Sequence, residues 1–254
     1  MKIGTWNVNS IKAREEHVRR YLTDNAPDIL MVQELKSLDF PLEKISSDYE
    51  VMAVGQKTYN GVAIFSKSPL KKIMDALPGG AQDDQARYLE VETNDIRLIN
   101  IYLPNGNPCP GPKYDYKLAW MKRLYDRLSE LRQDDIPFLI GGDFNVIPEE
   151  KDCYDPKVWQ EDALFRLETR KAFRALLNLG LTDAFRVHDT RAGQYSFWDY
   201  QAGAWPKNNG IRIDHVLLSP RIADKLIAAN INATPRGWDK PSDHTPVEIE
   251  IAAA

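Results

Sequence analysis

The chain has 254 residues, 43% of them hydrophobic, which is enough to form one large α/β domain or two small ones. Its 37 acidic and 33 basic residues give a formal net charge of −4. This charge excludes the class of strongly basic proteins that bind nucleic acid through charge alone. Any contact with a polyanion must therefore use a local basic surface or a bound metal ion.

The sequence also bears on where the protein works. Residues 1–7 lack the apolar segment of a signal peptide, and no apolar run approaches the ~20 residues needed to span a membrane. Cys109 and Cys153 have no CxxC partner and no zinc-ligand spacing. We expect a soluble cytoplasmic protein with two free thiols.

Short apolar runs alternate with amphipathic stretches along the chain. The hydrophobic pattern predicts strands at 2–8, 28–33, 51–54, 61–66, 88–92, 96–102, 137–141, 211–219 and 247–251. It predicts helices at 12–23, 114–131 and 164–179, with Ser10 as the first N-cap and Gly180 after the last helix. In the middle helix, one apolar face is predicted from Leu118, Met121, Tyr125 and Leu128.

The order of these elements indicates the fold class. Because the strands between 51 and 102 follow one another without a helix, we expect them to pair antiparallel. Polar segments at 105–113, 148–162 and 188–210 are predicted to be long loops, and no repeat or linker divides the chain. The pattern favours one α/β domain, 1–254, in which two mixed β-sheets are flanked by helices.

The segment Gly142-Asp143-Phe144-Asn145 follows the predicted strand at 137–141. Residues two apart in an extended chain face the same side, so Asp143 and Asn145 are expected to project together. A carboxylate that can take a proton and a fixed amide suit the holding and activation of a water molecule. The alternative is an Asx turn, in which the Asp143 side chain binds only the local backbone.

Polar side chains recur at other predicted strand ends, namely Asn7, Glu34, Tyr102, Asp214, and Asp243 with His244. Ligands gather outside strand ends in layered α/β folds, so we expect these residues to converge with Asp143 on one site. Each has an ordinary alternative when taken alone. Asp214, for example, could pair with Arg212 at the surface.

Such convergence crowds several carboxylates together, and each one opposes the ionisation of the others. A divalent cation would offset this repulsion between the carboxylates. Carboxylate and amide oxygens select a hard ion such as Mg²⁺, with Mn²⁺ as a substitute. The residues alone therefore predict a metal-dependent site for the hydrolysis of phosphate esters.

An ordered set of motifs closely resembles the exonuclease III family of DNA-repair nucleases. The matching stretches are 5–12, 30–36, 60–67, 100–106, 141–145, 195–200, 212–214 and 240–247, and they cover the chain nearly end to end. The resemblance implies a four-layer α/β sandwich and a monomer. It also implies Mg²⁺-dependent action on double-stranded DNA: cleavage 5′ to abasic sites, removal of 3′-blocking groups and degradation from 3′ ends.

The resemblance implies a role for each residue near the metal and the attacking water. Glu34 would be a metal ligand, with Asn7 and Asp243 near the ion. Asp143 would orient or deprotonate the water, and Asn145 would position it.

The remaining site residues would bind the substrate. His244 would hold the scissile phosphate with Asp214 as its carboxylate partner, and Tyr102 and Asn105 would complete the phosphate contacts. The pocket for a base-less sugar and its surroundings would be built from Phe197, Trp198, Ile211 and Ile213. Candidates for contact with the DNA backbone are Lys12, Arg14, Lys36, Lys57 and Lys207.

The chain departs from the family pattern after Asn105. The stretch 106–110 lacks an arginine that animal relatives insert into DNA, and Gln201 takes the place of a bulkier wedge residue. These departures favour 3′-end processing over tight clamping of abasic sites.

Two other functions stay open at the level of sequence. One is a phosphatase or phosphodiesterase of the wider endonuclease/exonuclease/phosphatase superfamily that acts on lipid headgroups or small-molecule phosphates; Lys36 and the Phe197-Trp198 stretch argue against it. The other is a DNA-binding module without catalysis, which the complete set of catalytic positions argues against.

Overall fold

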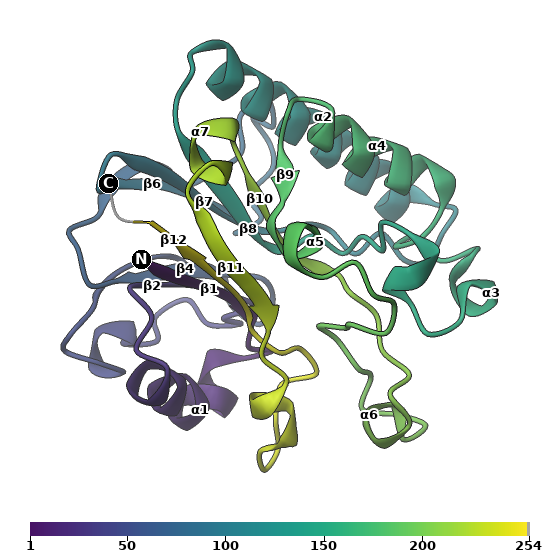
Figure 1. Cartoon of the computed structure of the whole chain (residues 1–254), viewed down its shortest axis with the longest axis horizontal. Helices are drawn as coiled ribbons and strands as arrows, with labels where there is room; N and C mark the ends of the chain where they lie inside the picture. The colour runs from purple at the N-terminus through teal and green to yellow at the C-terminus, as the bar shows by residue number, and fades with distance from the viewer. Residues whose placement is uncertain (253–254) are drawn as a thin grey trace.

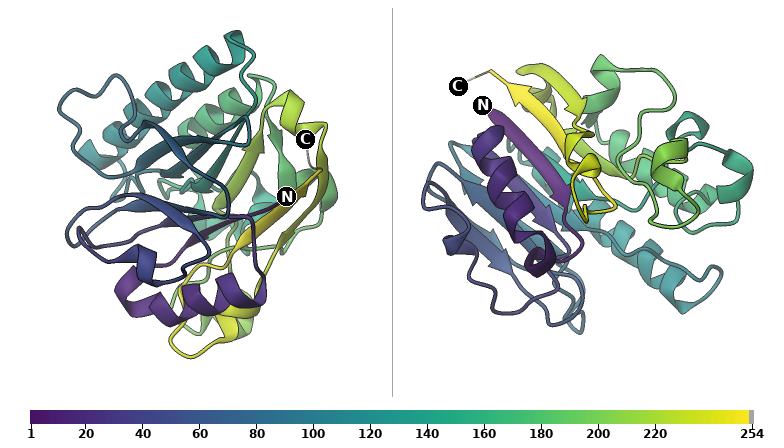
Figure 2. Two further views of the ribbon diagram at one scale, coloured as in Figure 1. Left: turned by 90° about the vertical axis from the view of Figure 1, so that its left-hand side faces the viewer. Right: turned by 90° about the horizontal axis from the view of Figure 1, so that it is seen from below.

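The computed structural model describes residues 1–252 and consists of two stacked β-sheets with helices on both outer faces (Figures 1 and 2). The first sheet has the strand order β11-β12-β1-β2-β4-β3, in which only the central pair β1 and β2 is parallel. Its strands are β1 (Lys2–Asn7), β2 (Ile29–Gln33), β3 (Glu50–Val54), β4 (Val62–Ser66), β11 (Leu226–Ile231) and β12 (Val247–Ile251).

The second sheet has the order β5-β6-β7-β8-β10-β9, and again only one pair, β7 and β8, is parallel. Its strands are β5 (Lys71–Met74), β6 (Tyr88–Thr93), β7 (Ile96–Tyr102), β8 (Phe138–Asp143), β9 (Thr182–Asp183) and β10 (Asp214–Leu218). The two mixed sheets and the antiparallel pairing of β3 with β4 and of β6 with β7 confirm the predictions.

Alternation along the central strands explains the four layers. In β2, Ile29 and Met31 pack into the core between the sheets, whereas Leu30 and Val32 pack into the core shared with α1 (Ile11–Asp24). Because consecutive strand residues face opposite sides, an unbroken apolar run must be covered on both faces.

The second sheet is covered by α2 (Pro112–Gln133) and α4 (Leu167–Leu177), which lie side by side in Figure 1. The shorter helices lie in the connections: η1 (Leu42–Lys44), η2 (Glu150–Asp152), α3 (Pro156–Trp159), α5 (Ala184–His188), α6 (Ala204–Lys207), α7 (Pro220–Ala223) and η3 (Thr234–Gly237). No helix within residues 1–252 is both long enough and apolar enough to cross a membrane.

Several predicted boundaries were wrong. The helix predicted at 164–179 is shorter and forms α4, and the strand predicted at 211–219 becomes regular only at Asp214. Ser10 stands at the N-cap of α1, but its side chain makes no capping hydrogen bond. The helix start is instead held by the backbone, because the amides of Ser10 and Ile11 donate to the carbonyls of Glu34 and Leu35.

Three strands, β5, β9 and β11, were missed, and all three lie at sheet edges. An edge strand pairs on one side only and exposes much of its surface, so its apolar pattern is weak. β5 begins with two lysines, and no residue of β11 is fully buried.

Candidate active site

The carboxyl ends of the parallel strand pairs β1–β2 and β7–β8, one pair in each sheet, lie close together. Asn7, the last residue of β1, donates hydrogen bonds from Nδ2 to Glu34 Oε1 (2.8 Å) and to Asp143 Oδ2 (2.9 Å). Glu34 directly follows β2, and Asp143 ends β8. The predicted convergence of polar strand ends is therefore present, and one amide joins the two sheets at this point.

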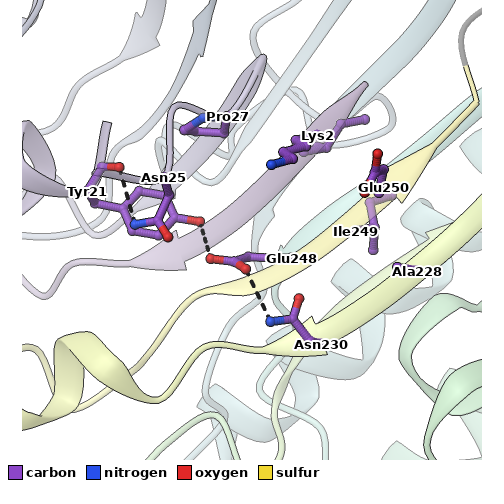
Figure 3. Close-up of a pocket in the computed structure, with 10 residues that line it drawn as sticks. Lys2, Tyr21, Asn25, Pro27, Ala228, Asn230, Glu248, Ile249 and Glu250 are labelled. Carbon is purple, nitrogen blue, oxygen red and sulfur yellow. Dashed lines mark hydrogen bonds between the residues drawn. The ribbon is translucent and has the colours of Figure 1, made fainter. Parts of the chain in front are cut away.

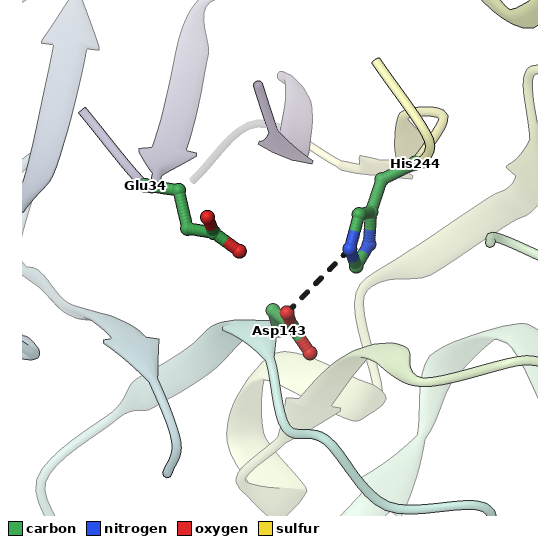
Figure 4. A group of neighbouring side chains, drawn as sticks. All are labelled: Glu34, Asp143 and His244. Atoms are coloured by element: carbon green, nitrogen blue, oxygen red, sulfur yellow. Dashed lines mark ion pairs between the residues drawn. The ribbon is translucent and has the colours of Figure 1, made fainter. Parts of the chain in front are cut away.

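Glu34, Asp143 and His244 form a tight group of possible metal ligands (Figure 4). One ligand atom from each residue lies within 4.8 Å of the others. Asn7 supports the group through its two hydrogen bonds, and Asp243 lies in the same cavity, where it accepts a hydrogen bond from Asn9 (3.0 Å). Of the three predicted ligands, only Glu34 belongs to the group itself.

The Asp143 carboxylate is strongly perturbed. Its pKa is raised to about 7: burial is the largest cause, the negative charges of Asp214 and Glu34 add to the rise, and His244 opposes it. The pKa of Glu34 is lowered: burial alone would raise it, but Lys36, whose Nζ lies 2.7 Å from Glu34 Oε2, and the Asn7 amide outweigh burial. The paired Glu34 and Asp143 carboxylates fit a hard divalent cation, whose charge would offset their repulsion.

The turn after β8 fixes Asp143 and Asn145. Asp143 Oδ1 accepts a hydrogen bond from the Asn145 amide (2.8 Å), so the Asx turn exists, while Oδ2 faces the site. The Asn145 side chain donates to the Leu103 carbonyl (2.9 Å) and accepts from Asn105 Nδ2 (3.2 Å). Gly142 is required here, since it has a φ of 147° and a Cβ would lie 2.0 Å from the Ile101 carbonyl oxygen.

His244 lies at the other side of the group. Its Nδ1 donates to Asp214 Oδ2 (2.9 Å), and its Nε2 lies 3.7 Å from Asp143 Oδ2. Burial alone would lower the pKa of His244, but Asp214 and Asp143 raise it to about 10. The imidazole is therefore protonated at neutral pH and can donate from both nitrogens.

Asp214 does not pair with Arg212 at the surface, so that alternative was wrong. Arg212 is buried and binds Asp152 (2.7 Å) and Asp183 (2.9 Å). Asp214 is held instead by Ser196, whose Oγ donates to Asp214 Oδ2 (2.6 Å) and accepts from the Asp214 amide (3.1 Å). Sequence reasoning assigned Ser196 no role.

The group of Glu34, Asp143 and His244 opens into a cavity of about 300 Å³. Its polar residues are Glu34, Tyr102, Asn105, Asn107, Asp143, Asn145, Asp199, Asp243 and His244. Its apolar residues are Trp159, Leu164, Phe197, Ile211 and Ile213. Burial and the charges of Glu34 and Asp143 raise the pKa of Tyr102 well above its ordinary value, so the phenol stays a hydrogen-bond donor.

The structure corrects the assignment of Trp198. This side chain is buried outside the cavity, its ring centroid lies 4.8 Å from that of Trp205, and its Nε1 donates to Asn208 (3.0 Å). Trp198 therefore packs within the 188–210 loop and does not line this cavity. Trp159 and Leu164 line the cavity but were missed; the only sequence signal was an aromatic residue within a predicted polar loop.

Lys117 is a further residue that sequence reasoning missed. It is fully buried on α2, and its Nζ donates to the backbone carbonyls of Asn105 (3.0 Å) and Asn145 (2.6 Å). Burial lowers the pKa of its ammonium to about 7, against the charges of Asp143 and Asp162. The ammonium thus ties together the loops that follow β7 and β8. A lysine on the apolar face of an amphipathic helix was the available signal.

The side chains predicted to contact the DNA backbone differ in whether other parts of the protein already hold them. Arg14 donates to the carbonyls of Asn9 (2.8 Å) and Pro241 (3.0 Å), and Lys36 is paired with Glu34. Lys207 donates to its own loop at the Ala202 carbonyl (2.8 Å), whereas Lys12 and Lys57 are exposed.

A second groove, lined by residues of α1, β1, β11 and β12, is built differently (Figure 3). Its Glu248 accepts hydrogen bonds from Tyr21 (2.7 Å), Asn230 (3.2 Å) and Asn232 (2.8 Å). These contacts connect the helix to the sheet, which fits a structural role.

Comparison with known proteins agrees with this site. The model of the endonuclease/exonuclease/phosphatase family matches residues 4–244. Exodeoxyribonuclease III of Haemophilus influenzae is 31% identical, over 99% of this chain and 100% of the relative. A Neisseria 3′ phosphatase bound to product DNA hairpin matches with a TM-score of 0.96 and 37% identity, over 99% of both chains. An AP endonuclease from Archaeoglobus fulgidus matches with a TM-score of 0.94 and 34% identity, also over 99% of both chains.

Each of these relatives is named for an activity on DNA. The comparisons therefore support the nuclease and not the alternatives that act on lipid headgroups or lack catalysis. The four-layer fold and the sequence resemblance are both confirmed. The chain belongs to the endonuclease/exonuclease/phosphatase family and, within it, to the exonuclease III group of DNA-repair nucleases, which hydrolyse phosphodiester bonds.

Proposed function

We propose that this protein is a Mg²⁺-dependent DNA-repair nuclease that acts mainly at the 3′ ends of double-stranded DNA and also cleaves 5′ to abasic sites. The observation that carries the proposal is the group of Glu34, Asp143 and His244, which is joined by Asn7 and opens into one cavity. Carboxylates, a protonated imidazole and amide donors are the groups that phosphodiester hydrolysis requires.

Asp143 is the proposed general base. A pKa of about 7 places its carboxylate near neutrality, where a general base is most effective. The Asn145 amide, fixed by Asn105 and the Leu103 carbonyl, holds the attacking water beside it. A cation held by Glu34 and Asp143, when bound, would stabilise negative charge on the phosphate and the leaving oxygen.

Protonated His244 and Tyr102 are the proposed donors to the phosphate oxygens. Asp214 fixes the orientation of His244 through Nδ1, which leaves Nε2 toward the cavity. Donors fixed in place before the reaction stabilise developing negative charge without the cost of reorganisation. The apolar residues Phe197, Ile211 and Ile213 suit a deoxyribose that carries no base.

One gel compares the rates of 3′-phosphate removal, abasic-site cleavage and exonuclease action. Duplexes with a 3′-phosphate, an abasic site or a recessed 3′-OH are incubated with equal enzyme and Mg²⁺. We expect the 3′-phosphate and recessed duplexes to react faster than the abasic one, because the chain lacks an inserted arginine after Asn105. Faster abasic cleavage would reverse the assignment of the main activity.

Removal of divalent metal is expected to abolish cleavage. Without a cation, the carboxylates of Glu34, Asp143 and Asp214 repel the phosphate they must approach. Dialysis against chelator should reduce the rate below detection, and added Mg²⁺ or Mn²⁺ should restore it. Cleavage that continues in excess chelator would contradict the metal requirement.

Replacing Lys117 by methionine is expected to lower kcat by about 10- to 100-fold, because misplacement of catalytic groups by about 1 Å costs this much. The change keeps the length of the side chain but removes the contacts with the carbonyls of Asn105 and Asn145. Steady-state kinetics on a 3′-phosphate duplex measure it, and exposed Lys171→Met is the control. An unchanged kcat in a folded variant would show that the ammonium does not position the loops.

We also propose a monomer in the cytoplasm. Two free cysteines, one of them buried, fit a reducing compartment. Light scattering of the purified protein tests the monomer, and fractionation of the source cells tests the location.

A further inference from the structure

A separate small cavity, lined by both charged and apolar side chains, lies away from the catalytic group, between α4, α5 and the segment around η2. Its volume is about 120 Å³, and none of its lining residues lines the catalytic cavity. Five cationic side chains line it: Lys151, Arg170, Arg174, Arg186 and Arg212. Such a concentration of cations is unusual in a chain whose formal net charge is −4.

The cations deepest in the structure are neutralised by protein. Arg212 binds Asp152 (2.7 Å) and Asp183 (2.9 Å), and Arg186 also binds Asp152. The two positive charges of these arginines are therefore balanced by the two negative charges of Asp152 and Asp183. Lys151 pairs with Glu149 at 3.0 Å.

Arg170 and Arg174 are left without adequate counter-charge. No salt bridge within residues 1–252 involves Arg170; its Nε is buried without a hydrogen-bond partner, and its guanidinium stacks 4.4 Å from the Phe165 ring. Arg174 reaches an acid only at 3.9 Å, the Glu149 that Lys151 already neutralises. The two arginines lie four residues apart on α4, where like charges destabilise a helix.

The size and chemistry of the cavity restrict its occupant. A volume of about 120 Å³ is well below the roughly 300–1,000 Å³ of sites for drug-sized ligands. Guanidinium groups present planar donors that match the oxygens of phosphate. We propose that this cavity is an anion site that binds a single phosphate group between Arg170 and Arg174.

The site has a direct connection to the catalytic cavity. Arg212 lies between Ile211 and Ile213, which line that cavity, and it is two residues before Asp214. The Arg212 amide also donates to the Asp152 carbonyl (2.8 Å), in the segment that carries Lys151. The phosphate could be free or part of a nucleotide, and both are chemically related to products of phosphoester hydrolysis.

Titration calorimetry in chelator tests the proposal, because the uncompensated catalytic carboxylates then repel phosphate. Inorganic phosphate and a deoxynucleoside 5′-monophosphate are titrated separately at ionic strength matched with NaCl. We expect saturable binding of phosphate and, at tenfold the Kd, a rise in Tm of about 3–5 °C. Equal affinity for the nucleotide would show that its phosphate enters the cavity, whereas binding of phosphate alone would identify the free ion as the occupant.

Variants of the two arginines test whether phosphate binds in this cavity. Arg174→Ala, which removes a side chain that is 65% exposed and should not disturb folding, is expected to weaken phosphate binding about tenfold. Arg170→Gln should weaken it similarly. Lys171→Ala, on the same helix but lining the groove between α2 and α4, should bind phosphate like the parent. Absence of saturable binding above the chloride control, or undiminished binding in both arginine variants, would overturn the proposal.

Discussion

Replacement of Asp143 by asparagine is expected to lower kcat for DNA cleavage by about 10²–10⁴-fold, the range that a general base contributes. Asparagine retains the shape of the side chain and can still accept the hydrogen bond from the Asn145 amide. It cannot take a proton from water, and it removes one of the charges that would hold a cation. Single-turnover kinetics on a 3′-phosphate duplex in Mg²⁺ measure the loss.

The same variant should be at least as stable as the parent when metal is removed. The pKa of Asp143 is about 7 in the folded protein against an ordinary value of 3.8, so the folded chain holds this proton more tightly than the unfolded chain. The contribution of this group to stability is therefore greatest below about pH 4 and is lost as the pH rises toward 7. In chelator at about pH 8, Asp143→Asn should have an equal or higher Tm.

These two measurements separate chemistry from folding. Asp126→Asn, an exposed change on α2, serves as the matched control and should alter neither rate nor Tm. Near-parental kcat in Asp143→Asn would refute the assignment of the base. A large fall in Tm would instead mean that the carboxylate is structural.

Replacement of His244 by alanine is expected to reduce kcat/KM by about 10²–10³-fold, the cost of removing one fixed donor to a developing negative charge. The buried imidazole is protonated at neutral pH because Asp214 and Asp143 raise its pKa to about 10. Activity that depends on this proton is lost as the pH rises through about 10.

The pH profile distinguishes a donor role from a structural one. In Asp214→Asn the nearest negative charge is lost, so the pKa of His244 should fall, and the alkaline limb of the profile should move down by about one to three units. Ser196 continues to hold the asparagine in place, since its Oγ also accepts the Asp214 backbone amide. An alkaline limb that does not move would show that His244 does not act as the protonated donor.

Much of the catalytic site was predictable because its residues follow regular strands. Asn7, Glu34, Tyr102 and Asp143 lie at the carboxyl ends of two parallel pairs, and alternation in those strands sets which side chains face the core. The fold class followed from the same pattern. Central strands, buried on both faces, gave the strongest apolar runs, whereas three of the four edge strands, β5, β9 and β11, were missed.

Irregular segments explain the errors. Phe197 lines the cavity and Trp198 does not, yet both lie in a loop whose backbone has no fixed period from which a facing direction can be predicted. The buried face of α2 was only partly predicted, since Met121 and Leu128 are buried as expected. Leu118 and Tyr125 are only partly buried, whereas Tyr114, Lys117 and Leu124 are buried. The charge of Lys117 removed it from the predicted apolar face, although backbone carbonyls on the neighbouring loops compensate that charge.

The binding of Mn²⁺ to the parent and to Glu34→Gln, followed by electron paramagnetic resonance alongside the cleavage rate, examines the metal centre itself. Loss of one carboxylate charge is expected to weaken Mn²⁺ binding at least about tenfold and to reduce cleavage with it. The exposed control Glu16→Gln should match the parent in both. Parental Mn²⁺ affinity and parental cleavage in Glu34→Gln would contradict a catalytic ion held at the junction of the two sheets.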